Sequence, residues 1–195
     1  MTKTTGGITL FGSFDIFSGV LKSIEIEDGG GSKLGEQGFG AMLDLVTSQT
    51  RQSKKFCFIG NGGSAAIASH QATDFFKNGQ VRAMAFNDSS LLTCLSNDYN
   101  YAEIFSRQIE RMAEPGDILF AISSSGRSPN ILNGVDAAKK IGCHVVTLSG
   151  FDEDNPLRRL GKINFYVPSH SYAHVENAHL LICHTLLDAL IAARK

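Results

Sequence analysis

Five short apolar runs, separated by segments of helical periodicity, constrain the fold of this chain more than any other feature. The runs are predicted strands, at residues 55–59, 81–86, 117–122, 143–148 and 162–167. Predicted helices lie between or after them, at residues 64–77, 88–96, 101–113, 129–141 and from about 173 onward. Strands that are apolar throughout need cover on both faces, which helical crossovers provide. The pattern predicts an α/β fold, with a doubly wound, five-stranded parallel sheet flanked by helices in a flavodoxin-like sandwich.

The first 38 residues follow a different pattern. Residues 14–26 place apolar side chains on one helical stripe, and a glycine-rich loop follows at residues 27–38. Phe39 then opens a second amphipathic helix. We therefore expect residues 1–195 to form a single domain, in which 1–38 is a helical N-terminal extension and 39–195 is the α/β core.

The composition narrows the class of protein. The net charge is −1, and no run of Lys and Arg forms the basic patch that nucleic-acid binding requires. No uninterrupted apolar stretch approaches the ~18 residues of a membrane span, and the N-terminus lacks the basic segment of a signal peptide. The four cysteines form no CxxC pair, which favours reduced thiols. We expect a soluble cytoplasmic protein that contacts neither nucleic acid nor a membrane.

The segment GNGGS, residues 60–64, follows the first predicted strand. In parallel sheets ligands bind at the carboxyl ends of the strands, so this position matters. Its glycines permit positive φ and close backbone approach, and Ser64 is placed to cap the next helix. A tight strand-to-helix turn and an anion or sugar-hydroxyl site explain the segment equally well. It is not a dinucleotide-binding fingerprint, because GxGxxG does not match.

A second segment, SSSGRS at residues 123–128, lies between the strand at 117–122 and the helix at 129–141. Four hydroxyls and successive backbone N–H groups at a helix start favour a phosphate group, through unpaired donors and the positive end of the helix dipole. The density of hydroxyls favours this interpretation over a plain flexible loop. A nucleoside triphosphate is not expected, because the lysine of the GxxxxGK[ST] motif is missing.

Two predicted helices carry both a histidine and a carboxylate. His70 and Asp74, spaced i, i+4, share one face of the helix after GNGGS. In the last helix, Glu176, His179 and His184 interrupt a strongly apolar pattern. Histidine and carboxylate together are ligands for a zinc-type ion and also serve acid–base catalysis. Hydrogen-bonded core or interface residues are the alternative, and the spacing favours neither.

Asp98 is a further polar candidate, within the segment NDYNYAEIF at residues 97–105. It follows a polar turn and precedes an amphipathic helix, so a helix-capping role is the slightly better interpretation from the sequence alone.

Together these segments resemble the sugar isomerase (SIS) family, and within it the phosphoheptose isomerases. The resemblance extends over residues 39–195 and is carried by GNGGSAAIASH (60–70), LSNDYNYAEIFSRQIE (95–110), GDILFAISSSGRSPNIL (116–132) and HVENAHLLICH (174–184). It implies a SIS-type sandwich assembled as a homotetramer, with active sites between subunits. The implied reaction converts D-sedoheptulose 7-phosphate to D-glycero-D-manno-heptose 7-phosphate, toward the nucleotide-activated heptose of bacterial surface glycans.

The resemblance also implies roles for residues of this chain. Phosphate-binding serines fall on Ser123, Ser124, Ser125 and Ser128. Contacts to the rest of the substrate fall on Asn61, Gly62, Gly63, Ser64, Asp98 and Glu176. The ligands of a zinc ion, one per subunit, fall on His70, Asp74, Glu176 and His184.

Three of these positions differ from the family pattern. Asp74 stands where the family has a glutamate, Glu176 where it has a glutamine, and Asn78 where an arginine is typical. The hypothesis for an enediol mechanism gives Asp74 the carbon-bound proton and His184 the proton on oxygen. Two alternatives stay open: a non-catalytic regulator or scaffold that binds sugar phosphates and docks a protein such as a replication initiator, and an isomerase of another sugar phosphate.

Overall fold

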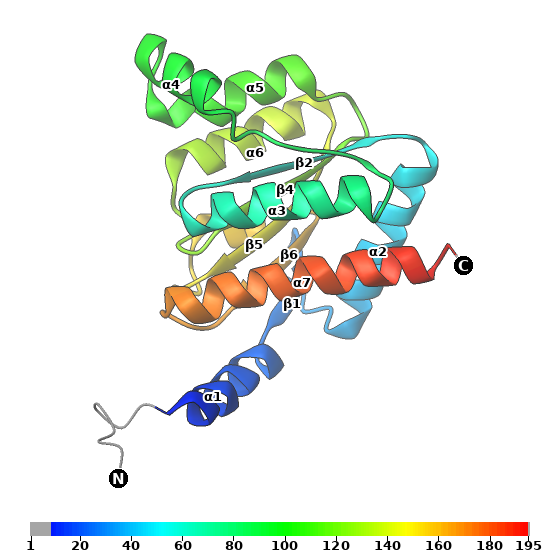
Figure 1. Ribbon diagram of the computed structural model, residues 1–195, viewed down its shortest axis with the longest axis vertical. Coiled ribbons are helices and arrows are strands. Elements are labelled where there is room, and N and C mark those ends of the chain that lie inside the picture. Colours follow the sequence, from blue (N-terminus) through cyan, green and yellow to red (C-terminus); the bar gives the residue numbers. More distant parts are fainter. Residues whose placement is uncertain (1–8, 195) are drawn as a thin grey trace.

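The computed structural model describes residues 9–194, which form an α/β sandwich (Figure 1). The described residues contain one sheet, made of the strands β1 (Glu25–Asp28), β2 (Lys55–Gly60), β3 (Arg82–Ala85), β4 (Ile118–Ser123), β5 (His144–Gly150) and β6 (Ile163–Val167). The α-helices are α1 (Leu10–Lys22), α2 (Glu36–Arg51), α3 (Gly63–Lys77), α4 (Ser89–Asp98), α5 (Ile104–Met112), α6 (Pro129–Ile141) and α7 (Tyr172–Ala192). Two short 3-10 helices are η1 (Tyr101–Glu103) and η2 (Pro156–Arg159). The predicted fold class is confirmed.

Strands β2 to β6 run parallel, in the spatial order β6-β5-β4-β2-β3. They match the five predicted strands to within two residues at every end. The chain winds outward from β2 to β3 and then returns to the other side of β2 to form β4. This reversal opens a crevice at the carboxyl ends of β2 and β4, where ligands of such sheets bind.

The predicted number of strands is wrong, because β1 adds an antiparallel edge strand beside β6. Residues 25–28 were expected to end a helix and begin a loop. The helix instead ends at Lys22, and an alternating polar–apolar pattern follows. Ile26 points into the core, whereas Glu25 and Glu27 bind the guanidinium of Arg158 at 2.6 and 2.5 Å. A strand places both carboxylates on the same side, which explains the pairing.

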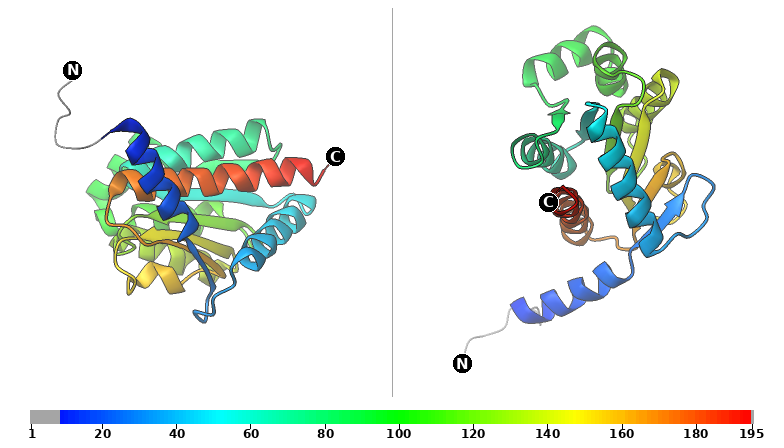
Figure 2. Two further views of the ribbon diagram at one scale, coloured as in Figure 1. Left: turned by 90° about the horizontal axis from the view of Figure 1, so that it is seen from below. Right: turned by 90° about the vertical axis from the view of Figure 1, so that its right-hand side faces the viewer.

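Helices cover both faces of the sheet (Figures 1 and 2). One face packs against α2, α3 and α7 in a core that includes Phe58, Phe75 and Phe120. The other face packs against α5 and α6 in a second core that includes Ile59 and Ile109. Helices α3 and α7 lie side by side and begin at the same end of the molecule, next to the crevice.

By length and composition alone, α7 is the one described helix that could cross a membrane. Its apolar side chains have a simpler explanation in the fold. Val175, Ala178, Cys183, Leu186 and Leu190 are buried against the sheet and the neighbouring helices. The apolar composition of α7 therefore reflects core packing.

Helix α1 makes little contact with the rest of the fold and projects away from it (Figure 2). None of its residues is buried, and Leu10, Phe11, Phe14 and Ile16 are each more than half exposed. Phe17, Val20 and Leu21, in the second half of α1, pack against the start of α7 and the end of β6. An apolar helix surface of this kind is typical of an interaction site.

Candidate functional site

A cavity of about 230 Å³ lies at the crevice between the carboxyl ends of β2 and β4. The segments predicted from GNGGS and SSSGRS both line it, and so does the start of α7. Its lining residues are Asn61, Gly62, Gly63, Ser64, Ser123, Ser124, Ser125, Ser128, Tyr172 and Glu176. The structure thus brings together nine residues predicted from the sequence or from the resemblance, and it adds Tyr172.

The serines after β4 form one wall of this cavity. Ser123 and Ser124 are buried, and the Ser123 hydroxyl accepts a hydrogen bond from the backbone N–H of Gly126 at 3.2 Å. The Ser124 hydroxyl is buried and has no hydrogen-bond partner among the described residues. Buried polar groups in proteins are nearly always paired, so this hydroxyl beside a polar cavity is available to bond a ligand or an ordered water.

The turn between β4 and α6 determines the position of the serine-lined wall. Gly126 adopts a φ of +61°, and a side chain there would collide with Asn155. Ser128 is the N-cap of α6, and its hydroxyl makes no capping hydrogen bond. Pro129, the first residue of α6, has no N–H, and the Ile131 N–H donates to Asn130 Oδ1 at 3.0 Å. The positive end of the α6 dipole beside the serine-lined wall still favours an anion.

The glycines after β2 form the opposite wall. Gly62, with a φ of +53°, is the N-cap of α3. The capping role expected for Ser64 is therefore wrong: Ser64 lies inside the helix and is buried. A side chain on Gly63 would occupy the position of the Glu176 carboxylate from α7. This glycine lets Glu176 approach the first turn of α3, where the helix dipole favours a negative charge.

A hydrogen-bonded amide pair holds the two walls at a fixed spacing. The side chains of Asn61 and Asn130 exchange two hydrogen bonds, each of 2.9 Å. The Tyr101 hydroxyl also donates to Asn61 Oδ1 at 3.1 Å. Asn130 is almost fully buried, so the pair forms part of the scaffold. Asn130, Tyr101 and Tyr172 were not predicted from the sequence; the one available signal was the asparagine directly after SSSGRSP.

The second group of predicted residues meets where α3 lies against α7. His70 Nε2 lies 3.4 Å from Asp74 Oδ2, and His184 Nδ1 lies 3.7 Å from the same oxygen. The two imidazole rings meet edge to face, with centroids 5.2 Å apart. Asp74 is one-fifth exposed, while His70 and His184 are 53% and 37% exposed. Asn78 donates to the other oxygen of Asp74 at 3.4 Å.

This cluster fits a zinc-type ion. One ligand atom from each of His70, Asp74 and His184 lies within 4.8 Å of the other two. Two imidazole nitrogens and a carboxylate oxygen are a donor set of catalytic zinc sites, which keep a fourth position open. The cluster is also accessible from solvent. Glu176 is not part of this group of atoms, so its role as a further ligand stays a prediction.

Asp98 lies apart from both groups. It is the last residue of α4 and is exposed, and its carboxylate accepts hydrogen bonds from Asn97 Nδ2 at 2.9 Å and from the Cys94 thiol at 3.6 Å. The next helical turns begin from Asn100 and Glu103. The capping role that the sequence favoured for Asp98 is therefore wrong, and its contact with substrate stays a prediction.

Comparison with known protein families connects this geometry to a family. The SIS domain model matches residues 32–150, which is more than half of the chain and includes both walls of the cavity. This chain belongs to the SIS domain family. The match ends before α7, so the His184 side of the cluster lies outside the matched residues.

Individual SIS proteins agree with the assignment. A phosphoheptose isomerase of Coxiella burnetii is 38% identical over 155 residues, which cover 75% of this chain and 78% of that protein. The solved phosphoheptose isomerase of Neisseria gonorrhoeae superposes with a TM-score of 0.78 at 29% identity, over 92% of this chain and 94% of that one. A phosphoheptose isomerase from Francisella tularensis also gives a TM-score of 0.78, at 25% identity, over 92% and 93% of the two chains. The predicted family and branch are confirmed.

Proposed function

We propose that this SIS protein is a phosphoheptose isomerase, an aldose–ketose isomerase that converts D-sedoheptulose 7-phosphate to D-glycero-D-manno-heptose 7-phosphate. The relatives named above support the activity. The observation that carries the proposal is the pairing of a hydroxyl-lined cavity with a histidine–carboxylate cluster along the same two helices. His70 follows Gly63 by seven residues, which is roughly 10 Å along α3. An extended sugar phosphate can therefore place its phosphate in the cavity and its far end near the cluster.

The cavity would bind the two polar parts of the substrate. The serine hydroxyls and the positive end of the α6 dipole suit the phosphate, and the proposed ligands are Ser123, Ser124, Ser125 and Ser128. Donors and acceptors on the other wall suit the sugar hydroxyls, from Asn61, Gly62, Gly63, Ser64 and Glu176. Asp98 is a further proposed contact, outside the cavity lining. Holding the remote phosphate orients the reacting carbons, which lowers the entropic part of the barrier.

The cluster would carry out the proton transfers. Asp74 is proposed to move the proton between C1 and C2, and His184 to serve the neighbouring oxygen. The carboxylate lies 3.7 Å from the His184 imidazole, so one side chain can act on carbon while the other acts on the adjacent oxygen. His70 Nε2, at 3.4 Å from the same carboxylate oxygen, also holds Asp74 in place.

The same residues would hold a zinc ion, one per subunit, with His70, Asp74 and His184 as ligands and Glu176 as the proposed fourth. When bound, such an ion polarises the carbonyl and stabilises the negative charge that develops on its oxygen. Asp74 would then have two tasks, and its second oxygen, which faces Asn78, is free of the histidines for the proton transfer.

We further propose a cytoplasmic homotetramer in the supply of activated heptose for bacterial surface glycans such as lipopolysaccharide. The exposed apolar side chains of α1, such as Phe11 and Phe14, support assembly, because exposed apolar patches of this kind usually mark protein–protein contacts. Burial raises the pKa of Cys57 and Cys183 to about 12, which keeps both as thiols and suits a reducing compartment.

An NMR time course with D-sedoheptulose 7-phosphate, with and without a chelator, tests the activity. We expect conversion to the aldose heptose 7-phosphate, and loss of conversion in the chelator with recovery on added zinc. Stoichiometric zinc in the purified protein would agree. Metal-free protein that binds the sugar phosphate without converting it would instead identify the non-catalytic regulator.

A further inference from the structure

A second cavity, of about 270 Å³, lies at the amino-terminal ends of β5 and β6. It is lined by Gly29, Lys139, Cys143, His144, Val145, Arg159, Leu160, Gly161 and Lys162. Four of these residues are basic and none is acidic. We call it the basic cavity and define it by Lys139, His144, Arg159 and Lys162. The chain as a whole carries a net charge of −1, so this local excess of positive charge is not a consequence of composition.

The cations of the basic cavity are not neutralised within the described residues. Lys139, Arg159 and Lys162 have no carboxylate within ion-pair distance there. The ring nitrogens of His144 have no hydrogen-bond partner in the same part of the chain. These groups come from the last turn of α6 (Lys139), the start of β5 (His144), the end of η2 (Arg159) and the segment that follows η2 (Lys162).

The neighbouring carboxylates are already bound to other groups. Asp117 lies 3.0 Å from the Lys55 ammonium and accepts two backbone N–H groups, each at 2.8 Å. Glu114 also pairs with Lys55, at 3.1 Å. Asp28, beside Gly29, accepts the backbone N–H groups of residues 30 and 32, which lower the pKa of its carboxyl. None of these acids is available to the basic cavity.

Cys143 adds no negative charge to this cavity, because burial raises the pKa of its thiol to about 11. Burial and the charge of Lys162 together lower the pKa of His144. The His144 imidazole therefore lies in a positive electrostatic field, and a bound anion would reduce that field. The cavity offers cationic and N–H donors without competing acceptors, which are the groups that bind phosphate.

The basic cavity is separate from the serine-lined cavity. Strand β5 begins at His144, which lines the basic cavity. It ends at Gly150, whose N–H donates to the carbonyl of Ser124 at 3.0 Å, beside the serine-lined cavity. Six residues of strand separate these points by roughly 20 Å. A ligand in the basic cavity would not compete for the site proposed above.

We propose that the basic cavity is a second anion-binding site, which takes a dianionic phosphate group, free or on a small organic ester. Lys139, Arg159 and Lys162 bind the phosphate oxygens through charge-assisted hydrogen bonds, and His144 donates from the floor of the cavity. This proposal is independent of the isomerase activity, since it uses none of the residues assigned to that reaction.

The test is an NMR titration of the His144 ring at constant ionic strength. Sulfate is the first probe, because it stays a dianion throughout the pH range and its charge does not titrate with the protein. The His144 resonances should shift along a saturable curve, and the pKa of His144 should rise as the anion binds. Affinity should accordingly increase as the pH falls through that pKa. A shift that is absent, or that grows linearly without saturation, overturns the proposal.

Matched variants locate the binding. Lys139→Ala, Arg159→Ala and Lys162→Ala should each weaken sulfate binding by roughly fivefold, the effect of one exposed ion pair. Lys140→Ala removes a neighbouring charge from the same last turn of α6 but does not line the cavity, so binding should be unchanged. Lys162→Arg should retain binding, which separates lost charge from damaged folding. Equal weakening by Lys140→Ala and Lys139→Ala would contradict a defined site.

Two further probes distinguish the source of the anion. Inorganic phosphate and glycerol 3-phosphate are titrated in the same way, with the His144 ring as the reporter in both cases. Tighter binding of the ester supports a site for phosphorylated metabolites, and equal binding supports a site for free phosphate. A reporter that responds to neither, although it responds to sulfate, would overturn phosphate as the ligand.

Discussion

The serine-lined cavity and the histidine–aspartate cluster lie along the same two helices, but they are built in opposite ways. The cavity is made of backbone turns and buried hydroxyls, and the Asn61–Asn130 pair fixes its walls. The cluster is made of partly exposed side chains on α3 and α7. The first is fixed by the fold of one chain, whereas the second depends on three side chains and on what covers them.

This difference separates binding from chemistry. Hydroxyls held by a rigid turn can select a phosphate without any proton transfer. Partly exposed histidine and aspartate side chains can gain or lose protons and a metal ion, which the reaction requires. We therefore expect variants of the cluster to reduce turnover, and variants of the cavity to reduce affinity. Three predictions test this separation and a fourth tests the packing of α7; they follow from the largest expected effect to the smallest.

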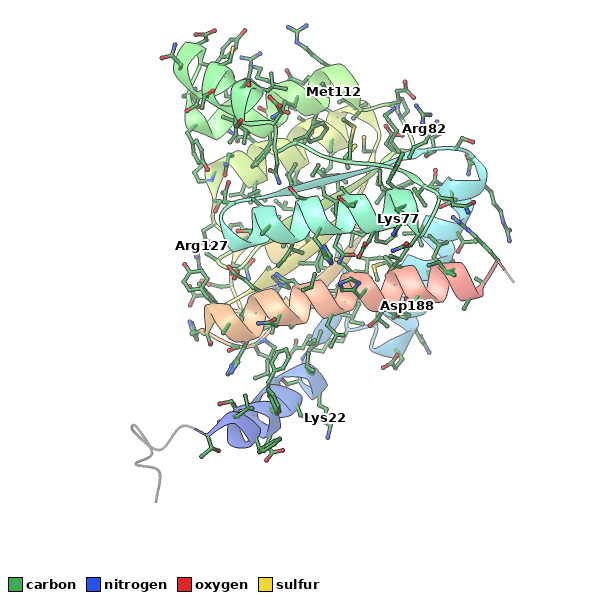
Figure 3. The ribbon with its side chains drawn as sticks, in the orientation of Figure 1. Lys22, Lys77, Arg82, Met112, Arg127 and Asp188 are labelled. Atoms are coloured by element: carbon green, nitrogen blue, oxygen red, sulfur yellow. The ribbon has the colours of Figure 1, made fainter. Side chains whose placement is uncertain are left out.

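Asp74→Asn and His184→Ala should each lower kcat by roughly 10²- to 10⁴-fold, the range for loss of a general acid or base. Substrate binding should persist, because the cavity is untouched. The measurement is the steady-state rate of heptose phosphate formation, with isothermal titration for binding. Asp188→Asn is the control, since Asp188 is an exposed carboxylate one turn further along α7 (Figure 3). Equal losses in the control would contradict the assigned roles.

His179, on the buried side of α7, should make stability depend on pH. Burial lowers its pKa from 6.5 to about 4, although a hydrogen bond with the Ser149 carbonyl opposes the shift. Between these values the unfolded chain binds a proton that the folded chain does not. The free energy of unfolding should therefore fall by about 3 kcal/mol as the pH drops from 6.5 to 4.

Urea unfolding at several pH values measures this effect. The variant His179→Leu should be less stable at neutral pH and should have a flatter pH profile than the parent. Parallel profiles for the two proteins would show that His179 does not titrate in this way.

Ser124→Ala should raise KM by roughly tenfold or more, since a hydrogen bond to a charged group contributes about 1.5–3 kcal/mol. The kcat should change little, because Ser124 is distant from the proton transfers. Initial rates over a range of substrate concentrations separate the two constants. Ser90→Ala, in the exposed first turn of α4, serves as the control. A variant with normal KM and reduced kcat would place Ser124 in the chemistry instead.

Asp74→Glu should have the smallest effect, a change in kcat within roughly tenfold. The longer side chain restores the residue that the family resemblance implies at this position, and the neighbouring Asn78, which donates to Asp74 Oδ1 at 3.4 Å, carries no charge. The kcat of Asp74→Asn measures the contribution of the carboxylate group, and the kcat of Asp74→Glu measures the contribution of its side-chain length. Complete loss in Asp74→Glu would show that the shorter reach is required.

The sequence predicted the parallel sheet and the cavity because both depend on local patterns. Continuous apolar runs indicate buried parallel strands, and GNGGS and SSSGRS follow two of them directly. Strand β1 was missed because Ile24 also fits the helical stripe predicted for residues 14–26, and the position of the strand depends on Arg158, more than 130 residues away. Ser64 was misassigned as a cap because Gly62, with positive φ, starts the helix one residue earlier than expected.

The cluster of His70, Asp74 and His184 could be proposed from the sequence but not assembled from it. Spacing placed His70 and Asp74 on one face of α3, which the structure confirms as a contact. That His184 would meet them required the packing of α3 against α7, which no local pattern encodes. Tyr172 could not be predicted for the same reason, since the position of α7 in the fold brings it to the cavity.

The most direct test of the central claim follows D-sedoheptulose 7-phosphate by NMR in D₂O. If the cavity holds the phosphate while Asp74 moves a proton between carbons, the parent should form the aldose and incorporate deuterium at the reacting carbon. Asp74→Asn should bind the sugar phosphate yet show neither product nor exchange. A parent protein that binds the substrate but neither converts nor exchanges it, with metal supplied, would contradict the account.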